Sequence, residues 1–311
     1  MLSTLQIVLP VFALILVGWL ARRFHLLGLH AAGEINRFVV YLALPALLFD
    51  IVSRAQLAEI WQPAFMTTFG LGCLLVFVVT LILRHKGGRP LPDAAIDALG
   101  ASYANTGFMG FPLALAVFGP MALAPTLIAA ILTVCVLFAI AIIVIEVGQQ
   151  SEPRLTPLCL KVGRSLLRNP LLMSPALGAV FPMAELSVPD VVGSFVQLLG
   201  GAASPCALVG LGLFLAEKRD APRSEGAAAT TLIACKLLLH PLAVWLLATQ
   251  VFHLSPSLTQ QVVLLAALPT GTGPFMLAEF YRREASMTSK MIVGSTALSV
   301  LTITALITLW R

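Results

Sequence analysis

The chain has 311 residues, of which 59% are hydrophobic and only 11% are charged, and its mean hydropathy is +0.97. A soluble domain carries about 25% charged residues, so this composition excludes a soluble protein and indicates an integral membrane protein. The formal charge of +5 does not indicate a nucleic-acid partner, because the basic residues fall in short gaps between apolar segments.

The chain start and the cysteines exclude further classes. The first twenty residues have no Lys or Arg ahead of their apolar run, which predicts a first transmembrane helix rather than a signal peptide. The cysteines form no CxxC pair and no cluster with histidine, and they lie at Cys73, Cys135, Cys159, Cys206 and Cys235. We therefore expect no disulfide, no metal site and no cofactor.

Ten apolar segments are candidate membrane-spanning helices, since roughly 20 residues at ~1.5 Å each cross the hydrocarbon core. In chain order they are 5–24, 34–52, 62–83, 94–118, 121–147, 169–181, 191–216, 227–251, 258–281 and 287–310. The sixth is short and flanked by prolines. The gaps are short, so no soluble domain is expected between the spans.

Basic residues alternate between these gaps. The odd gaps hold Arg22, Arg23, Arg37, Arg84, Lys86, Arg89, Arg154, Lys161, Arg164, Arg168, Lys218, Arg219, Arg223, Arg282, Arg283 and Lys290, and the even gaps hold little besides Arg54. Lys and Arg are enriched in cytoplasmic loops. The pattern therefore predicts that the odd gaps are cytoplasmic and that both termini lie outside the cytoplasm.

A weak internal repeat divides the chain into residues 1–150 and 165–311. It pairs Pro10 with Pro170, Gly18 with Gly178, Ala43 with Ala203, and Pro45 with Pro205. So few matches also arise by chance in a chain rich in Pro and Gly. Each half would hold five spans, however, and an odd number forces the second half to enter from the opposite side, which gives inverted repeats.

Two spans carry residues that disrupt a helix at membrane depth. They are Asn105, Thr106, Gly107, Gly110 and Pro112 in span 94–118, and Pro269, Thr270, Gly271, Thr272 and Gly273 in span 258–281. Glycine and proline disfavour the helix, and unwound backbone persists in a membrane only inside protein or beside a watery cavity. We therefore predict two broken helices that cross near the midplane and form a transporter binding site.

The broken ends carry partial charges. Half-helix N-termini are worth about +0.5 charge and suit an anion, whereas the exposed carbonyls of C-termini suit a cation. The alternative is that Gly and Pro only allow close helix packing and kinks. Two breaks occur together with the polar residues Asn105, Thr270 and Thr272, which favours a binding site. These three residues are the predicted polar contacts to the substrate.

Three ionisable residues are further candidates. Lys236 lies too deep in span 227–251 for its side chain to reach water, so it needs a polar partner or a watery cavity. It either balances a substrate charge, titrates during coupling, or binds carbonyls freed at a broken helix. His240 lies one turn further on and is expected to be structural or to assist coupling. Asp50 forms either an interfacial ion pair with Arg54 or a coupling or gating group.

The sequence contains no HExxH, GxSxG or Walker P-loop motif and no paired intramembrane aspartates. These motifs would indicate an enzyme or an ATP-driven pump. We therefore expect no enzymatic activity, and any transport would use an existing gradient.

An ordered set of residues resembles the auxin efflux carrier family of bacterial and plant transporters over nearly the whole chain. The set comprises Leu9, Pro10, Gly18, residues 35–39, residues 44–49, residues 105–112, Asn169, Pro170, Leu177, Gly178, Pro205, Gly210, Lys236, Pro241, Pro269, Ala278 and Tyr281. The segment 270–275 looks like the bacterial branch that is often assigned to malonate and related carboxylates.

The resemblance implies an all-α membrane protein with ten transmembrane helices in two inverted five-helix repeats, related to bile-acid and sodium/proton transporters. Helices 1, 2, 6 and 7 would form a scaffold, and helices 3–5 and 8–10 a mobile transport domain, usually within a homodimer. By position, Asn105 and Pro112 match the family's crossing in helix 4, and Pro269 that in helix 9. Gly273 and Pro274 depart from a pattern that often has Asn-Ala there.

These inferences together predict a secondary transporter or uniporter of a small organic anion in a bacterial inner membrane, with elevator-type alternating access. Its expected partners are the anion, membrane lipid and a second copy of the chain. A coupling ion would be H⁺ or Na⁺. Two alternatives stay open: a transporter of another solute coupled to Na⁺ or H⁺ on the same fold, and a transceptor that senses its ligand without moving it.

Overall fold

The computed structural model describes residues 2–28, 30–54, 61–149, 164, 167–168, 170–216 and 224–310. Every regular element in this part of the chain is helical, and its one extended pairing is an isolated antiparallel bridge between Ala104 and Thr270. Several predicted features lie outside the described residues, namely Cys159, Asn169 and the basic residues Arg154, Lys161, Lys218, Arg219 and Arg223.

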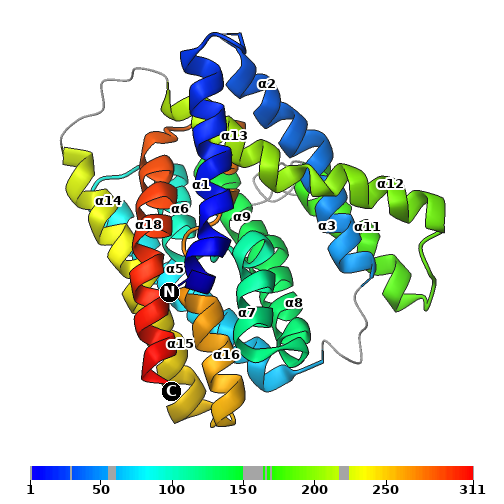
Figure 1. Ribbon diagram of the computed structural model, residues 1–311, viewed down its shortest axis with the longest axis vertical. Coiled ribbons are helices and arrows are strands. Elements are labelled where there is room, and N and C mark those ends of the chain that lie inside the picture. Colours follow the sequence, from blue (N-terminus) through cyan, green and yellow to red (C-terminus); the bar gives the residue numbers. More distant parts are fainter. Residues whose placement is uncertain are drawn as a thin grey trace.

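One group of helices comes from the beginning of each half of the chain. It comprises α1 (Leu2–Arg23), α2 (Ala31–Phe38), the π-helical turn η1 (Val39–Ala43), α3 (Leu44–Ser53), α11 (Pro170–Met183), α12 (Asp190–Gly201) and α13 (Ala203–Leu215). Within it, α1 packs on α13, and α3 packs on α11 and α12. In Figure 1 this group occupies the top and right of the molecule.

The second group holds the remaining helices. From the first half come α5 (Pro63–Lys86), α6 (Leu91–Ser102), η2 (Thr106–Gly110), α7 (Phe111–Phe118), η3 (Pro120–Ala122), α8 (Leu123–Ile131), η4 (Leu132–Leu137) and α9 (Phe138–Gly148). From the second half come α14 (Ser224–Ala234), η5 (Cys235–Leu239), α15 (His240–Leu246), η6 (Leu247–Val251), α16 (Pro256–Ala267), α17 (Gly273–Phe280) and α18 (Ser286–Leu309). Most of this group lies in the lower part of Figure 1.

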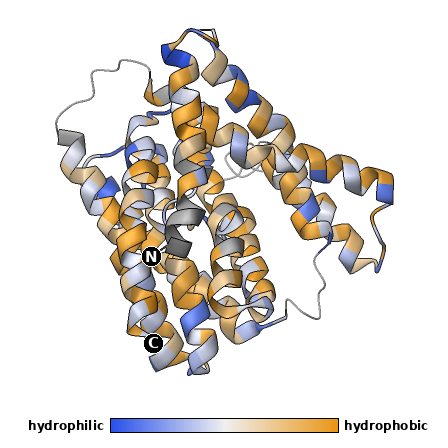
Figure 2. Ribbon diagram, in the orientation of Figure 1, coloured by the Kyte–Doolittle hydropathy of each residue, from blue (hydrophilic) through white to orange (hydrophobic). Residues whose placement is uncertain are grey.

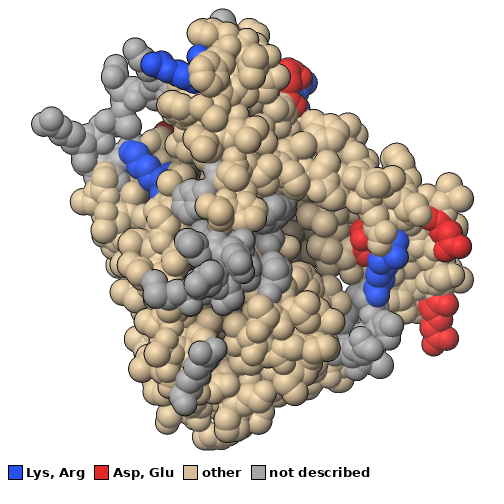
Figure 3. Space-filling view, viewed as in Figure 1, with Lys and Arg blue, Asp and Glu red and all other residues tan. Residues whose placement is uncertain are grey.

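Six helical runs in the described residues are long and apolar enough to cross a membrane. They are Ala31–Ser53, Pro63–Lys86, Pro120–Gly148, Asp190–Leu213, Gly226–Val251 and Ser286–Leu309, which correspond to six of the ten predicted spans. Figure 2 shows hydrophobic residues along most of these helices. On the face in Figure 3, charged side chains gather at the top and right, and a broad area is uncharged.

Large apolar side chains cover the outside of the helices, as expected for a surface that faces lipid. Leu75 in α5 is 49% exposed and Leu301 in α18 is 61% exposed. Lipid tails are as apolar as these side chains, so apolar burial between helices gains little there, and small residues that allow close approach carry the packing. The protein is therefore a multi-pass membrane protein, and the part of it that the structure describes is helical.

Glycines set the closest contacts within the first group. A Cβ on Gly18 of α1 would lie 2.1 Å from the Val209 carbonyl oxygen of α13, and one on Gly178 of α11 would lie 2.8 Å from the Phe49 carbonyl oxygen of α3. Only glycine allows two helix backbones to approach this closely. The two pairs of helices are therefore fixed in position by backbone contact.

Candidate functional site

The two interrupted helices meet at their breaks. Between α6 and η2, the Asn105 N–H donates to the Pro269 carbonyl oxygen over 2.9 Å. Between α16 and α17, the Gly271 N–H donates to the Tyr103 carbonyl oxygen over 3.2 Å. Unwound backbone inside a membrane must find such partners, because lipid offers none. Each break therefore supplies hydrogen-bond partners for part of the unwound backbone of the other.

Local sequence explains where the helices stop and restart. Leu268, the residue directly after α16, has φ −57° and ψ 149°, since the residue before a proline is driven out of the helical region. The helix restarts as α17 with Pro274 in its first turn, and α7 begins with Pro112 in its first turn. Proline fits there because the N–H groups of a first turn have no partner within the helix.

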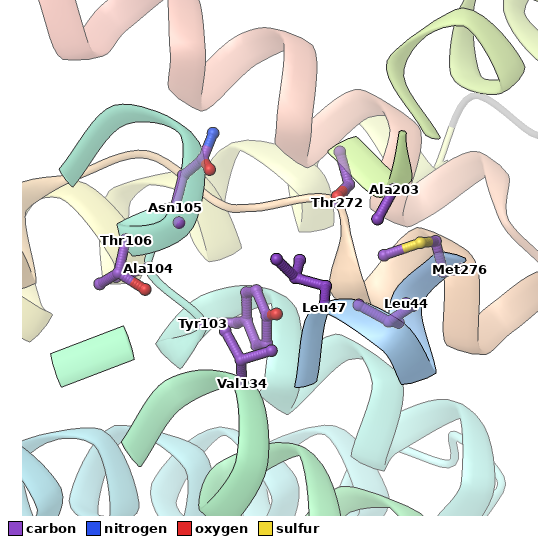
Figure 4. A pocket seen from close by; sticks show the side chains of 11 residues that line it. Leu44, Leu47, Tyr103, Ala104, Asn105, Thr106, Val134, Ala203, Thr272 and Met276 are labelled. Carbon is purple, nitrogen blue, oxygen red and sulfur yellow. The ribbon is translucent and has the colours of Figure 1, made fainter. Parts of the chain in front are cut away.

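A small cavity of about 40 Å³ lies beside the crossing. Its walls come from both helix groups, and they are Leu44, Leu47, Tyr103, Ala104, Asn105, Thr106, Gly107, Val134, Ala203, Thr272 and Met276. Figure 4 shows these side chains arriving from several separate ribbons. A cavity needs about 10–15 Å³ to hold one water, so this one has room for a few waters.

Thr106 is a residue of the cavity wall with a buried and unsatisfied hydroxyl. Thr106 is fully buried, and its hydroxyl oxygen has no hydrogen-bond partner among the described residues. A buried hydroxyl without a partner costs ~1–3 kcal/mol, so a ligand oxygen or a water is needed to satisfy it. Asn105 is 9% exposed, and its side chain does not cap η2, which leaves its amide for a ligand.

Thr270 and Thr272 have different positions. The Thr270 hydroxyl donates to the Gly100 carbonyl oxygen over 2.9 Å, and the Thr270 N–H donates to the Ser295 hydroxyl over 3.0 Å. Thr270 is fully buried and is not among the cavity walls. Thr272 precedes α17 and does line the cavity. The structure thus places Thr270 inside the crossing, where protein groups surround it, and Thr272 in the wall of the cavity.

The glycines of the second break pack against the ring of Tyr103. Tyr103 was not identified from the sequence as part of the site. A Cβ on Gly271 would lie 2.8 Å from the Tyr103 ring, and one on Gly273 would lie 2.6 Å from it. Gly110 in the first break has more room, with Leu268 and Thr126 at 3.4 Å. Tyr103 directly precedes the predicted break, and this position was the only sequence signal that it belongs to the site.

Lys236 and His240 lie behind the crossing rather than in the cavity wall. Both residues are fully buried. The Lys236 ammonium group donates to the Ala266 carbonyl oxygen over 2.7 Å and lies 3.0 Å from His240 Nδ1. His240 Nε2 lies 3.4 Å from Cys73 Sγ. The structure thus brings Lys236 to a broken helix end, one of the roles that the sequence left open.

Asp50 lies in a different part of the first helix group. It accepts a hydrogen bond from Arg54 one turn later, and Gln197 of α12 completes this contact when its amide is oriented to accept from Arg54. Asp50 is not among the residues that line the cavity at the crossing. The observed pair matches the interfacial ion pair that was one of its two predicted roles.

A cluster of ion pairs joins the two broken helices at the other end, and sequence reasoning did not find it. Asp93 in the first turn of α6 accepts from Arg283, which follows α17. This hydrogen bond raises the pKa of the Arg283 guanidinium. Asp97 accepts from Arg84 over 2.8 Å and from Arg89 over 3.3 Å. The start of α6 is therefore bound to the end of α17.

The helix ends give the site its charge preference. The cavity wall includes Thr106 and Gly107 at the start of η2, and Thr272 immediately before α17, so two half-helix N-termini border it. Their positive ends favour an anion. The opposite ends are occupied by protein groups, with the Thr270 hydroxyl on Gly100 and Lys236 on Ala266. Among the described residues, no cluster of His, Cys, Asp or Glu fits a metal ion.

A helical membrane protein with a cavity at two broken helices has the features of the membrane transport proteins. Residues 3–307 match the family described as "Membrane transport protein". A "Putative malonate transporter" of Rhizobium meliloti is 31% identical over 98% of this chain and 95% of its own length. The chain therefore belongs to this membrane transport protein family, which includes the auxin efflux carriers.

Other relatives span both bacteria and plants. An uncharacterized transporter of Escherichia coli K12 is 26% identical over 97% of this chain and 95% of its own length. Auxin efflux carrier component 8 of Arabidopsis thaliana is 21% identical over 91% of each chain. Because these relatives are named as transporters, the protein is a transporter rather than an enzyme.

Proposed function

We propose that this protein is a secondary transporter of a small organic anion, with a dicarboxylate of the malonate type as the first candidate. The observation that carries the proposal is the crossing itself, where two half-helix N-termini and the residues Asn105 and Thr272 border one cavity. The malonate assignment rests on the name of the Rhizobium meliloti relative.

The chemistry of the cavity supports a carboxylate. Two half-helix N-termini border it and favour negative charge, and the Asn105 amide and the Thr106 and Thr272 hydroxyls supply neutral donors nearby. Leu44, Leu47 and Met276 supply apolar surface for a short carbon chain. This combination suits a small anion with a few methylene groups.

The two helix groups support alternating access. Leu44, Leu47 and Ala203 of the cavity belong to the first group, whereas Tyr103, Asn105, Thr106 and Thr272 belong to the second. Because both groups wall the cavity, a movement of one group past the other exposes it first to one side of the membrane and then to the other. In the proposed mechanism the first group is the scaffold, and the second is the transport domain that slides or rocks against it.

We also propose ten membrane crossings in two inverted repeats. The predicted pairing of Gly18 with Gly178 is supported by packing, because each glycine lies in a close backbone contact between two helices of the first group. Inverted repeats place the two breaks face to face. The proposal extends to a homodimer in the inner membrane, with both termini outside the cytoplasm, and to H⁺ or Na⁺ as the coupling ion if transport is coupled.

The test is uptake of radiolabelled malonate, succinate and acetate into proteoliposomes. We expect uptake of at least one dicarboxylate by the wild type and a loss of about tenfold in Asn105→Ala. The control is Asn36→Ala in α2, the same change outside the cavity wall, which should keep the wild-type rate. Unchanged uptake by Asn105→Ala would remove this residue from the site. A ligand-dependent thermal shift without uptake would favour the transceptor.

A further inference from the structure

Lys236 is a fully buried charged residue that the transport proposal does not use. It lies in η5, in the middle of the membrane-spanning run Gly226–Val251, and its exposure is 0%. It forms no ion pair with any residue that the structure describes. A charged lysine at this depth is expensive unless polar groups surround it, so its charge must be balanced by something other than a carboxylate.

The end of α16 supplies that balance. This helix ends at Ala267, so the carbonyl groups of its last turn have no partner within the helix, and together they carry about −0.5 charge. The Lys236 ammonium group donates to one of them, Ala266, over 2.7 Å. The short distance is that of a charge-assisted hydrogen bond.

The second contact of the ammonium group is held in place by a further residue. An ammonium group only donates, so His240 Nδ1, 3.0 Å away, is an acceptor, and the ring hydrogen lies on Nε2. Nε2 faces Cys73 Sγ at 3.4 Å. His240 is therefore neutral in this arrangement and leaves the positive charge to Lys236.

The two broken helices differ in how their C-terminal ends are satisfied. The end of α6 receives the neutral Thr270 hydroxyl at Gly100, and the end of α16 receives the Lys236 ammonium group at Ala266. A bare helix C-terminus at membrane depth is otherwise a site for a cation. At the end of α16 this position is already filled by a side chain.

We infer that Lys236 is a built-in cation of the crossing, which takes the place of a bound metal cation at the end of α16, so that the binding site forms without sodium. The inference rests on the proposed function for the identity of the transported anion, but not for the role of the lysine. It excludes Na⁺ as the ion that assembles the crossing and leaves H⁺ or uniport.

The first experiment uses wild-type protein and needs no substrate. We expect the melting temperature in detergent to be the same, within 1 °C or so, in NaCl, KCl and choline chloride at equal ionic strength. In proteoliposomes, replacing Na⁺ by choline should leave uptake of the transported anion within about twofold. A saturable rise in melting temperature that is specific for Na⁺ would overturn the inference, whether or not anion uptake is found.

The second experiment removes the charge. Lys236→Met keeps most of the volume without the charge, and we expect a melting temperature several degrees lower and at least tenfold slower uptake. Lys236→Ala leaves room for a small cation, so 100 mM methylammonium should restore part of its melting temperature, whereas tetramethylammonium should not. Lys86→Met, at the exposed end of α5, is the matched control and should behave as wild type.

These measurements separate the inference from the transport proposal. A Lys236→Met protein with wild-type melting temperature and uptake would overturn the role of the lysine and leave the anion site untouched. If neither lysine variant can be purified, the wild-type comparison of Na⁺, K⁺ and choline still decides whether the crossing needs a metal cation.

Discussion

The backbone N–H of Asn105 donates to the carbonyl oxygen of Pro269 over 2.9 Å, and this bond joins the two halves of the chain at the point where each has lost its helix. Proline has no N–H and can only accept. With the backbone satisfied in this way, the side chain of Asn105 is not needed to hold the break together. It is left for the cavity, so a change of this side chain is expected to affect binding more than stability.

The first prediction concerns the unpaired hydroxyl of Thr106. Thr106→Val replaces it by a methyl group of nearly the same size. We expect the variant to fold as well as wild type or better, since a buried hydroxyl without a partner costs ~1–3 kcal/mol. Its uptake should fall ~10–100-fold, because a hydrogen bond to a charged ligand is worth ~1.5–3 kcal/mol. Melting temperature and proteoliposome uptake measure the two effects.

Thr133→Val is the matched control. Thr133 in η4 is also fully buried, its hydroxyl also has no partner among the described residues, and it does not line the cavity. The same substitution should therefore stabilise the protein and leave uptake unchanged. Equal uptake by the two valine variants would show that the Thr106 hydroxyl does not contact the substrate.

The second prediction concerns the contact between Gly273 and the ring of Tyr103. In Gly273→Ala the new methyl group would lie 2.6 Å from the ring, so the ring or the break must move, at a cost of ~1–3 kcal/mol for overpacking. We expect a lower melting temperature together with reduced uptake, because Tyr103 also lines the cavity.

Two further variants test this cause. Gly107→Ala places a methyl group where no atom lies within 4 Å and should keep the wild-type melting temperature. Adding Tyr103→Leu to Gly273→Ala should restore part of the lost stability, since the smaller side chain makes room. If the double variant is as unstable as the sum of both single changes, the ring is not the cause.

The sequence predicted the breaks because Gly and Pro act locally. Pro269 and Pro274 limit the backbone whatever surrounds them, and the observed interruption lies between Ala267 and Gly273, where these residues predict it. The burial of Lys236 also followed from its depth in an apolar span, and one of its three proposed roles describes the bond to Ala266.

The partners across the fold could not be predicted in the same way. Asp93 and Arg283 form their pair across 190 positions, and nothing in either segment indicates the other. In the same way, the contact of Tyr103 with Gly271 and Gly273 depends on how two breaks cross. Thr270 looked equivalent to Thr272 in the sequence, and only the structure shows that its hydroxyl lies on Gly100.

The third prediction concerns Asp97, whose side chain is 1% exposed and is bound by Arg84 and Arg89. Asp97→Ala leaves two guanidinium groups without their shared acceptor. Breaking a buried pair costs ~3–5 kcal/mol, and the arginines are about one quarter exposed, so we expect a loss toward the lower value. The change in melting temperature gives the measurement.

Glu34→Ala is the control for this loss. Glu34 pairs with Arg37, and both side chains are about 70% exposed (68% and 71%), so solvent screens the pair and it adds little stability. We expect no measurable change in melting temperature. An equal effect of Glu34→Ala and Asp97→Ala would mean that burial of the Asp97 carboxylate is not what gives the cluster its strength.

The last prediction concerns the close contact between α1 and α13, and here the sign of the effect is decisive. Gly to Ala in a helix normally gains ~0.8–1 kcal/mol from helix propensity, and Gly33→Ala in α2, with no atom within 4 Å, should be neutral or stabilising. In Gly212→Ala the methyl group would lie 2.0 Å from the Ile15 carbonyl oxygen and 2.8 Å from the Trp19 nitrogen. Backbone atoms cannot move aside as a side chain does, so the two helices must separate, and we expect a lower melting temperature despite the gain in propensity. A stabilised Gly212→Ala variant would show that α1 and α13 do not touch through their backbones, and the proposed scaffold would lose the contact that makes it rigid.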